Sequence, residues 1–126
     1  EKVQGTPFDF RTEKPIGRDL CAENAQLTLA GGYDHNFCLK GNMAAKARSQ
    51  KTGITMQVIT DRPGIQFYSG NFLHGQVGKA VYNRRSGFCL ETQTYPNAIN
   101  RADFASPVLK KGQKFHSRTT YRFGAK

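Results

Sequence analysis

Residues 114–123 read KFHSRTTYRF, and their side chains alternate between two kinds. One alternating set is aromatic or hydroxyl-bearing: Phe115, Ser117, Thr119, Tyr121 and Phe123. The set between them is mostly basic: Lys114, His116, Arg118, Thr120 and Arg122. Successive side chains of a strand point to opposite faces, so this period of two is typical of a half-buried antiparallel strand with a basic outer face. The stretch therefore predicts a β-strand.

Further runs extend this pattern through the chain. Residues 54–60 (ITMQVIT) are rich in β-branched side chains and place Ile54, Met56 and Val58 on one side. Shorter apolar runs occupy residues 36–40, 65–68 and 88–92, and turn signals containing Gly, Pro and Asn separate them. Helical periodicity is nearly absent, and residues 6–18 are expected to form an extended loop packed on a surface. Short strands between turns predict an all-β fold, an antiparallel sandwich or barrel.

Length and composition narrow the class of protein. A chain of 126 residues fits one domain, which we expect to span residues 1–126. No run approaches the roughly 18 apolar residues of a membrane-spanning helix, and no signal-peptide pattern follows Glu1, so we expect no membrane association. Because the chain does not begin with Met, we expect it to be processed, cut or truncated relative to its gene. The three cysteines lack metal-ligand spacing and are expected to be reduced thiols in a reducing compartment, the cytoplasm.

The charge balance is the unusual feature of the composition. Nineteen Lys and Arg residues against nine Asp and Glu residues give a formal net charge of +10, which attracts polyanions. The basic residues are scattered, and no nucleic-acid motif accompanies them. A solvated basic surface is the simplest interpretation, and a nucleic acid or another acidic assembly is the alternative partner.

Two short segments place polar groups at or near strand ends. In residues 31–37 (GGYDHNF), two glycines allow a tight turn, so Asp34 can project from a strand end, where functional side chains are common. The alternative is an Asx turn or a cap, with His35 solvated. In residues 63–72 (PGIQFYSGNF), Gln66 and Tyr68 share one side of a strand. An amide beside a phenol suits a polyhydroxylated ligand, although an exposed strand face explains the spacing equally well.

A third segment, residues 87–93 (GFCLETQ), carries a lone carboxylate on a strand. Cys89, Glu91 and Gln93 alternate with Phe88, Leu90 and Thr92. If Glu91 is partly buried, its pKa is raised and it can act as a base; otherwise it is one more solvent-facing glutamate.

Together and in this order, GYDHNF, PGIQFYSGNF and GFCLETQxYP resemble the C-terminal portion of the aldose 1-epimerase (galactose mutarotase) family. Three further stretches are also similar: GTPFDFR (residues 5–11), KPIGRD (14–19) and TTYRF (119–123). The resemblance therefore runs along nearly all of the chain. It implies a large antiparallel β-sandwich, of which residues 1–126 form the C-terminal part.

The resemblance also implies an isomerase that uses no cofactor and no metal, and that interconverts the α and β anomers of aldohexoses such as galactose and glucose. In that mechanism a base removes the proton of the C1 hydroxyl and an acid protonates the ring oxygen. By motif match Glu91 is the base, while Asp34 and Gln66 bind the sugar. The acid histidine of the family lies before the matched region, so this chain is expected to supply the base but not the acid.

Several positions depart from the family pattern. His74 stands where the family usually has Asp, and Thr94 occupies a position often held by His or Asn. His116 is expected to face outward on the last strand and does not replace the acid.

An incomplete sandwich leaves apolar faces and strand edges open, so we expect the missing N-terminal part or another chain as a partner. The alternative function is a non-catalytic sugar-binding or structural subunit derived from the family, which docks through its basic surface.

Overall fold

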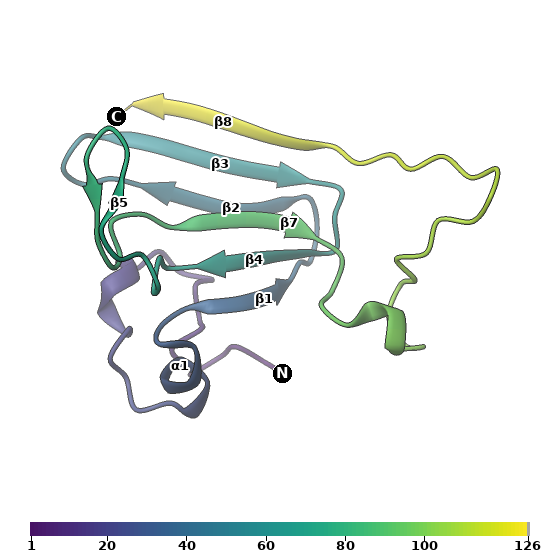
Figure 1. The fold of residues 1–126 in the computed structure, drawn as a ribbon, viewed down its shortest axis with the longest axis horizontal. Helices are drawn as coiled ribbons and strands as arrows, with labels where there is room; N and C mark the ends of the chain where they lie inside the picture. The colour runs from purple at the N-terminus through teal and green to yellow at the C-terminus, as the bar shows by residue number, and fades with distance from the viewer. Residues whose placement is uncertain (126) are drawn as a thin grey trace. The chain divides into compact units, whose positions relative to one another are not determined.

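In the computed structural model, which describes residues 1–125, the regular structure is mostly β-strand (Figure 1). The helical elements are short: η1 (Ile16–Arg18), α1 (Ala25–Ala30) and η2 (Ala98–Asn100). The strands in chain order are β1 (Asp34–Cys38), β2 (Met43–Arg48), β3 (Ile54–Thr60), β4 (Gly64–Tyr68), β5 (Gln76–Val77), β6 (Val81–Tyr82), β7 (Cys89–Gln93) and β8 (Thr119–Ala125). The predicted all-β class is confirmed. Within the described residues, no helix has the length and apolar character needed to cross a membrane.

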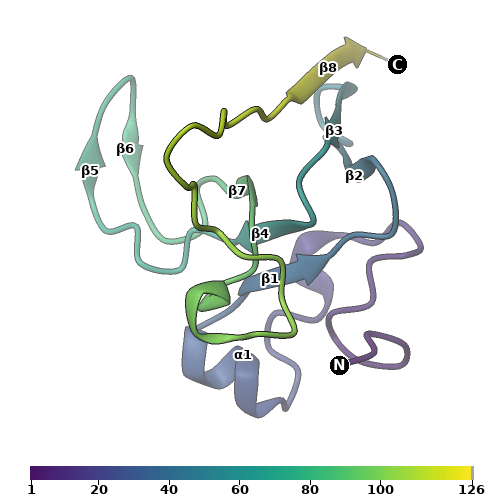
Figure 2. The ribbon, with the colours of Figure 1, turned by 90° about the vertical axis from the view of Figure 1, so that its right-hand side faces the viewer.

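The chain divides into two compact units. Unit 1 comprises Glu1–His35 and Phe67–Cys89, and unit 2 comprises Asn36–Gln66 and the chain from Leu90 onward. The strand order β1-β4-β7 defines one three-stranded sheet, and β2-β3-β8 defines another. A short hairpin of β5 and β6 belongs to unit 1 (Figure 2).

The sheet β2-β3-β8 forms around the apolar run that the sequence singled out. β3 coincides with the predicted strand and pairs antiparallel with β2 on one side and β8 on the other. Val58 lies opposite Tyr121, and Met56 lies opposite Phe123, so the apolar side chains of β3 and β8 meet in cross-strand pairs.

The last strand begins later than the alternation of residues 114–123 predicts. β8 starts at Thr119, which pairs with Thr60, the last residue of β3, and one further backbone bond joins the Asp61 N–H to the Arg118 carbonyl at 3.2 Å. The Asp61 carboxylate accepts hydrogen bonds from the Arg118 backbone N–H at 2.9 Å and from the Ser117 hydroxyl at 3.0 Å. The strand's expected burial is also absent: Phe123 is 71% exposed and Tyr121 is 47% exposed.

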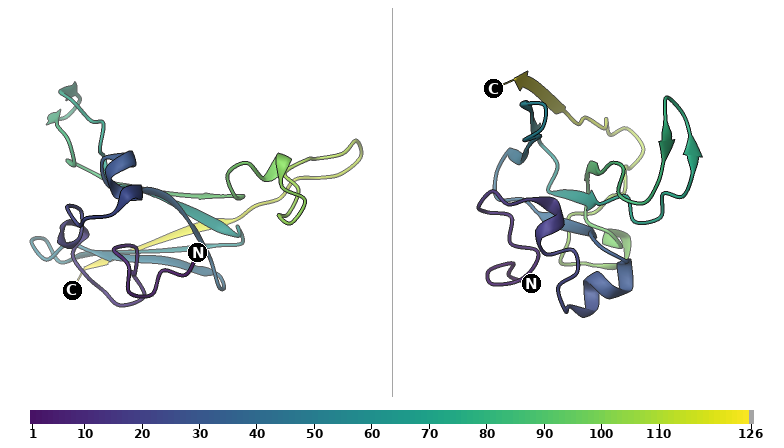
Figure 3. Two further views of the ribbon diagram at one scale, coloured as in Figure 1. Left: turned by 90° about the horizontal axis from the view of Figure 1, so that it is seen from below. Right: turned by 90° about the vertical axis from the view of Figure 1, so that its left-hand side faces the viewer.

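A chain of threonine hydroxyls crosses the interior of unit 2. Thr119 shares hydrogen bonds with Thr60 at 3.0 Å and with Thr92 at 2.7 Å. Val58, two residues before Thr60 in β3, is fully buried, and Ile65 of β4 is also buried. Between β7 and β8 the chain passes through η2 and a long irregular segment (Figure 3).

Unit 1 is built around aromatic rings. Tyr33 is fully buried and stacks on Phe67 at a centroid distance of 5.1 Å. Phe8 and Phe10 pack edge-on against Tyr33 at 5.8 and 5.1 Å. The N-terminal segment therefore packs on a surface, as predicted, but its residues Ile16–Arg18 form the 3₁₀ helix η1 instead of extended loop.

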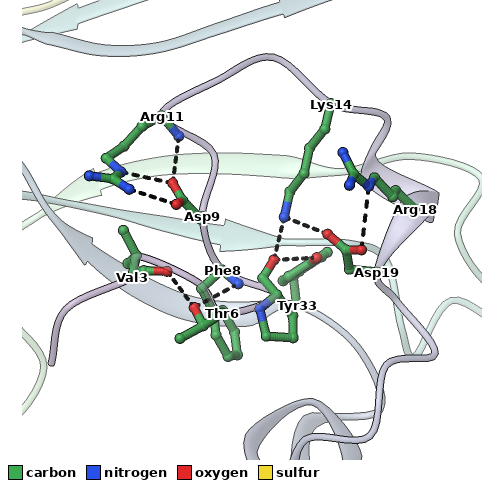
Figure 4. Close-up of polar contacts among 10 residues, drawn as sticks. Val3, Thr6, Phe8, Asp9, Arg11, Lys14, Arg18, Asp19 and Tyr33 are labelled. Atoms are coloured by element: carbon green, nitrogen blue, oxygen red, sulfur yellow. Dashed lines mark hydrogen bonds and ion pairs between the residues drawn. The ribbon is translucent and has the colours of Figure 1, made fainter.

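Polar contacts hold this segment in place (Figure 4). The Tyr33 hydroxyl donates to the Pro7 carbonyl at 2.9 Å, and the Lys14 ammonium donates to the same carbonyl at 2.7 Å. Lys14 also forms an ion pair with Asp19 at 2.6 Å.

Helix α1 is an element that the sequence reasoning missed. The Asn24 side chain caps its start by accepting from the backbone N–H groups of Gln26 and Leu27. Gly31 ends it in the left-handed conformation, with φ of 66°. Six residues are too few to show a helical period, so the caps were the available signal.

Candidate functional site

Strand β7 carries Glu91 and Gln93 on the same face of the sheet, because side chains two residues apart in a strand point the same way. Glu91 is exposed, so the partial burial that would by itself mark this residue as a base is not observed, and Gln93 is half-buried. The other face of β7 carries Thr92, whose hydroxyl joins the threonine chain in the interior of unit 2. The carboxylate of Glu91 is therefore directed away from that interior.

Three amide side chains meet on the Glu91 face. The Nε2 group of Gln93 donates to Gln66 Oε1 on β4 and to Asn36 Oδ1 on β1, each at 3.2 Å. Since β4 lies between β1 and β7 in strand order, the three amides form a polar row across the sheet. We call Asn36, Gln66 and Gln93 the amide row.

Gly64 at the start of β4 makes room for one end of this row. A Cβ atom at Gly64 would lie 2.5 Å from Asn36 Oδ1 and 3.1 Å from a ring carbon of Tyr95. Both distances are shorter than normal carbon contacts, so a Cβ atom at this position would have to displace the Asn36 amide. The Tyr95 hydroxyl hydrogen-bonds Cys38, and this contact raises the pKa of Tyr95, with burial adding to it.

Amides and carboxylates in this arrangement suit a ligand rich in hydroxyl groups. An amide presents both donors and an acceptor, whereas an ionised carboxylate only accepts. A sugar hydroxyl can satisfy either group, and its proton can pass to a carboxylate held beside it. This face therefore presents groups that suit a polyol, and the Glu91 carboxylate lies two residues from Gln93 along β7.

Asp34 is the predicted site residue that belongs to unit 1, where it directly follows the buried Tyr33. Its backbone N–H donates to Nδ1 of His35 at 3.0 Å. The His35 ring packs edge-on against Phe8 at 4.6 Å. Burial lowers the pKa of His35, and the neighbouring Asp34 carboxylate opposes this shift.

The other two histidines of the described chain are exposed. His74 follows the turn after β4, and His116 precedes β8. His116 Nδ1 lies 3.9 Å from the Asp61 carboxylate and faces outward, as the sequence predicts.

The structure thus brings two predicted residues, Gln66 and Glu91, onto neighbouring strands of unit 2. Sequence reasoning missed Asn36 and the role of Gln93 as the donor that links the row. Both lie inside the quoted motifs, and Gln93 shares the strand parity of Glu91. That parity was the signal that could have identified it.

The family model described as aldose 1-epimerase matches residues 1–122. The chain belongs to the aldose 1-epimerase family. Relatives in this family include galactose mutarotase from Homo sapiens, 42% identical over 128 residues, which cover 96% of this chain and 36% of that protein. Galactose mutarotase from Sus scrofa is 44% identical over the same coverage. Aldose 1-epimerase from Escherichia coli (strain K12) is 36% identical over 132 residues, covering 98% of this chain and 38% of the bacterial protein.

Comparison with a solved structure of the family also supports the aldose 1-epimerase fold. The galactose 1-epimerase from Lactobacillus acidophilus NCFM superposes with a TM-score of 0.69 at 26% identity. The match covers 99% of this chain and 37% of that chain. The chain therefore spans little more than a third of the length of its family relatives.

Proposed function

We propose that this chain is the C-terminal part of an aldose 1-epimerase and forms one side of a sugar site. The observation that carries the proposal is the Glu91 face of the β1-β4-β7 sheet, where a carboxylate accompanies the linked amides of Gln66 and Gln93. Family membership supports an isomerase acting on aldoses.

In the proposed reaction Glu91 acts as the general base. Its carboxylate removes the proton of the C1 hydroxyl while an acid protonates the ring oxygen, so the C1–O5 bond breaks and the aldehyde forms. Rotation about C1–C2 and return of both protons then close the ring with the opposite anomer. The support for this role is the match of the GFCLETQ segment to the family motif, and the exposed carboxylate of Glu91 is accessible to a ligand.

Gln66 is proposed to hydrogen-bond the sugar, and Asp34 is proposed to bind sugar hydroxyls. For Gln66, the contact from Gln93 at its Oε1 atom supports a fixed orientation of the amide. A fixed amide presents its donor and its acceptor at defined positions. It also loses less rotamer freedom on binding than a rotating amide does.

The acid is proposed to come from a part of the protein outside residues 1–126, as is the remainder of the sandwich. The exposed apolar side chains of β8 and of neighbouring strands support a covering partner of this kind, since apolar patches of this sort mark interaction surfaces. The unpaired thiols of Cys21, Cys38 and Cys89 support a reducing, cytoplasmic location.

Polarimetry of α-D-galactose with the full-length gene product tests the proposal. Glu91→Gln keeps the shape of the side chain and removes the base, so turnover should fall to the buffer rate. Glu23→Gln, the same chemical change at another exposed glutamate, should leave turnover unchanged. Activity that survives in Glu91→Gln would contradict the assignment of the base.

The second candidate function is a non-catalytic sugar-binding or structural subunit. The net charge of +10 favours it, because a basic surface suits docking onto an acidic assembly. A full-length protein that binds galactose, or forms a stable complex, without accelerating mutarotation would support this candidate over the first.

A further inference from the structure

Two buried polar side chains of unit 1, Ser69 and Asn71, hold the loop that leads from α1 to Asp34. Ser69 is 2% exposed and Asn71 is 5% exposed. They belong to the PGIQFYSGNF segment, but the proposed reaction assigns a role only to Gln66 of that segment. Buried polar groups cost free energy unless they are hydrogen-bonded, so their partners reveal what they stabilise.

Every hydrogen-bonding group of the Asn71 amide is used. Its Nδ2 group donates to the carbonyl oxygens of Ala30 at 3.0 Å and Tyr33 at 2.9 Å. Its Oδ1 atom lies 2.6 Å from the Ser69 hydroxyl and accepts from it. The Ser69 oxygen in turn accepts from the Tyr33 backbone N–H at 3.0 Å. Asn71 and Ser69 therefore bind both ends of residues 30–33.

These contacts fix the peptide group that precedes Asp34. Its carbonyl oxygen, on Tyr33, accepts from Asn71 Nδ2 and from the Ser69 backbone N–H, each at 2.9 Å. Its N–H, on Asp34, donates to His35 Nδ1 at 3.0 Å. A planar peptide with both polar groups held cannot rotate, so the position of the Asp34 Cα atom, from which the side chain leaves the backbone, is fixed.

The close fit of Gly32 shows how little room the contact leaves. Gly32 has a φ of 145°, and a Cβ atom there would overlap Asn71 Oδ1 and lie 3.0 Å from Ser69 Oγ. The glycine lets the loop backbone approach the Ser69–Asn71 pair directly. The backbone of residues 30–33 is therefore in direct contact with the Ser69 and Asn71 side chains.

We propose that Ser69 and Asn71 are positioning residues that orient Asp34 toward the sugar through the Tyr33–Asp34 peptide. The proposal rests on the proposed function, in which Asp34 binds sugar hydroxyls. A residue of this kind contributes to turnover only through the group that it positions, since small misplacements of a binding group reduce the rate. The proposal therefore predicts that the effect of a Ser69 substitution on kcat/KM depends on the presence of the Asp34 carboxylate.

A double-mutant cycle on the full-length protein tests this dependence, with mutarotation of α-D-galactose as the assay. Ser69→Ala should lower kcat/KM about tenfold, corresponding to about 1.4 kcal/mol, and Asp34→Ala should lower it at least as much. In the Asp34→Ala background, Ser69→Ala should change kcat/KM by less than about twofold, because no carboxylate remains to be positioned. Asn24→Ala is the stability control, since it removes a cap from α1 without touching the Tyr33–Asp34 peptide.

A second variant keeps the test decisive if one protein folds poorly. Asn71→Asp preserves shape but replaces two donors with an acceptor facing two carbonyl oxygens, and its effect on kcat/KM should likewise shrink in the Asp34→Ala background. Equal effects of Ser69→Ala in both backgrounds would overturn the positioning role and leave the proposed function standing. Wild-type rates in Asp34→Ala would overturn the proposed role of Asp34 and the positioning role together.

Discussion

Removing the Lys14 ammonium should destabilise the protein far more than removing a neighbouring surface cation. The Lys14 side chain is 7% exposed, and its ammonium donates to Asp19 at 2.6 Å and to the Pro7 carbonyl at 2.7 Å (Figure 4). It also lies 4.3 Å from the centre of the Phe10 ring. Lys14→Met keeps most of the aliphatic stem and deletes all three interactions.

The expected loss of stability depends on the interactions that the partners of Lys14 keep after the substitution. Hydrogen bonds to charged groups contribute about 1.5–3 kcal/mol, and breaking a buried ion pair at one end costs about 3–5 kcal/mol. The Pro7 carbonyl keeps its bond from the Tyr33 hydroxyl, and the Asp19 side chain is 27% exposed, so water replaces part of what is lost. Lys14→Met should therefore lower the free energy of unfolding by about 2–4 kcal/mol.

Denaturant unfolding of the full-length protein provides the measurement. Arg11→Met is the matched control, because Arg11 pairs with Asp9 at 2.7 Å in the same segment but is 60% exposed. Its loss should be a small part of the Lys14 effect, since exposed pairs are solvated and screened. After Lys14→Met the Asp19 carboxylate is left with the longer ion pair to Arg18, at 3.7 Å (Figure 4), so adding Asp19→Asn should recover part of the lost stability. The reasoning is refuted if Lys14→Met and Arg11→Met lose the same amount.

Three further predictions concern the amide row, the His35 ring and helix α1. Gly64→Ala should push the Asn36 amide aside and raise KM for galactose severalfold, as steady-state mutarotation would show; an unchanged KM would mean that the row does not contact the sugar. Because burial lowers the pKa of His35, the unfolded chain binds more protons just below pH ~6.5, so stability should fall as pH drops through that range. Unfolding curves of His35→Gln should lack this component of the pH dependence. Asn24→Ala should cost about 1 kcal/mol in the same unfolding assay, whereas Leu29→Ala, at a side chain 82% exposed, should cost little.

The strands with a strong local pattern were predictable from sequence. Residues 54–60 became β3 without a shift, because a β-branched run with period two favours extended backbone whatever its neighbours are. The end of the chain was harder. Alternation continues through residues 114–118, but a ladder needs a partner, and β3 supplies none before Thr119. Helix α1 was missed because its six residues rely on caps at Asn24 and Gly31.

The candidate site also has a part that the sequence predicts and a part that it does not. The succession of motifs in the sequence identified the family, and the same resemblance predicted Glu91, Gln66 and Asp34 as site residues, because motif order is a local property of the chain. Only the tertiary structure joined Asn36, Gln66 and Gln93 into one row, since these residues lie on three strands that are distant in sequence. The tertiary structure also showed that Ser69 and Asn71 bind the loop before Asp34. Hydrogen bonds between such distant residues depend on how strands pair and loops close, and no local pattern encodes that pairing.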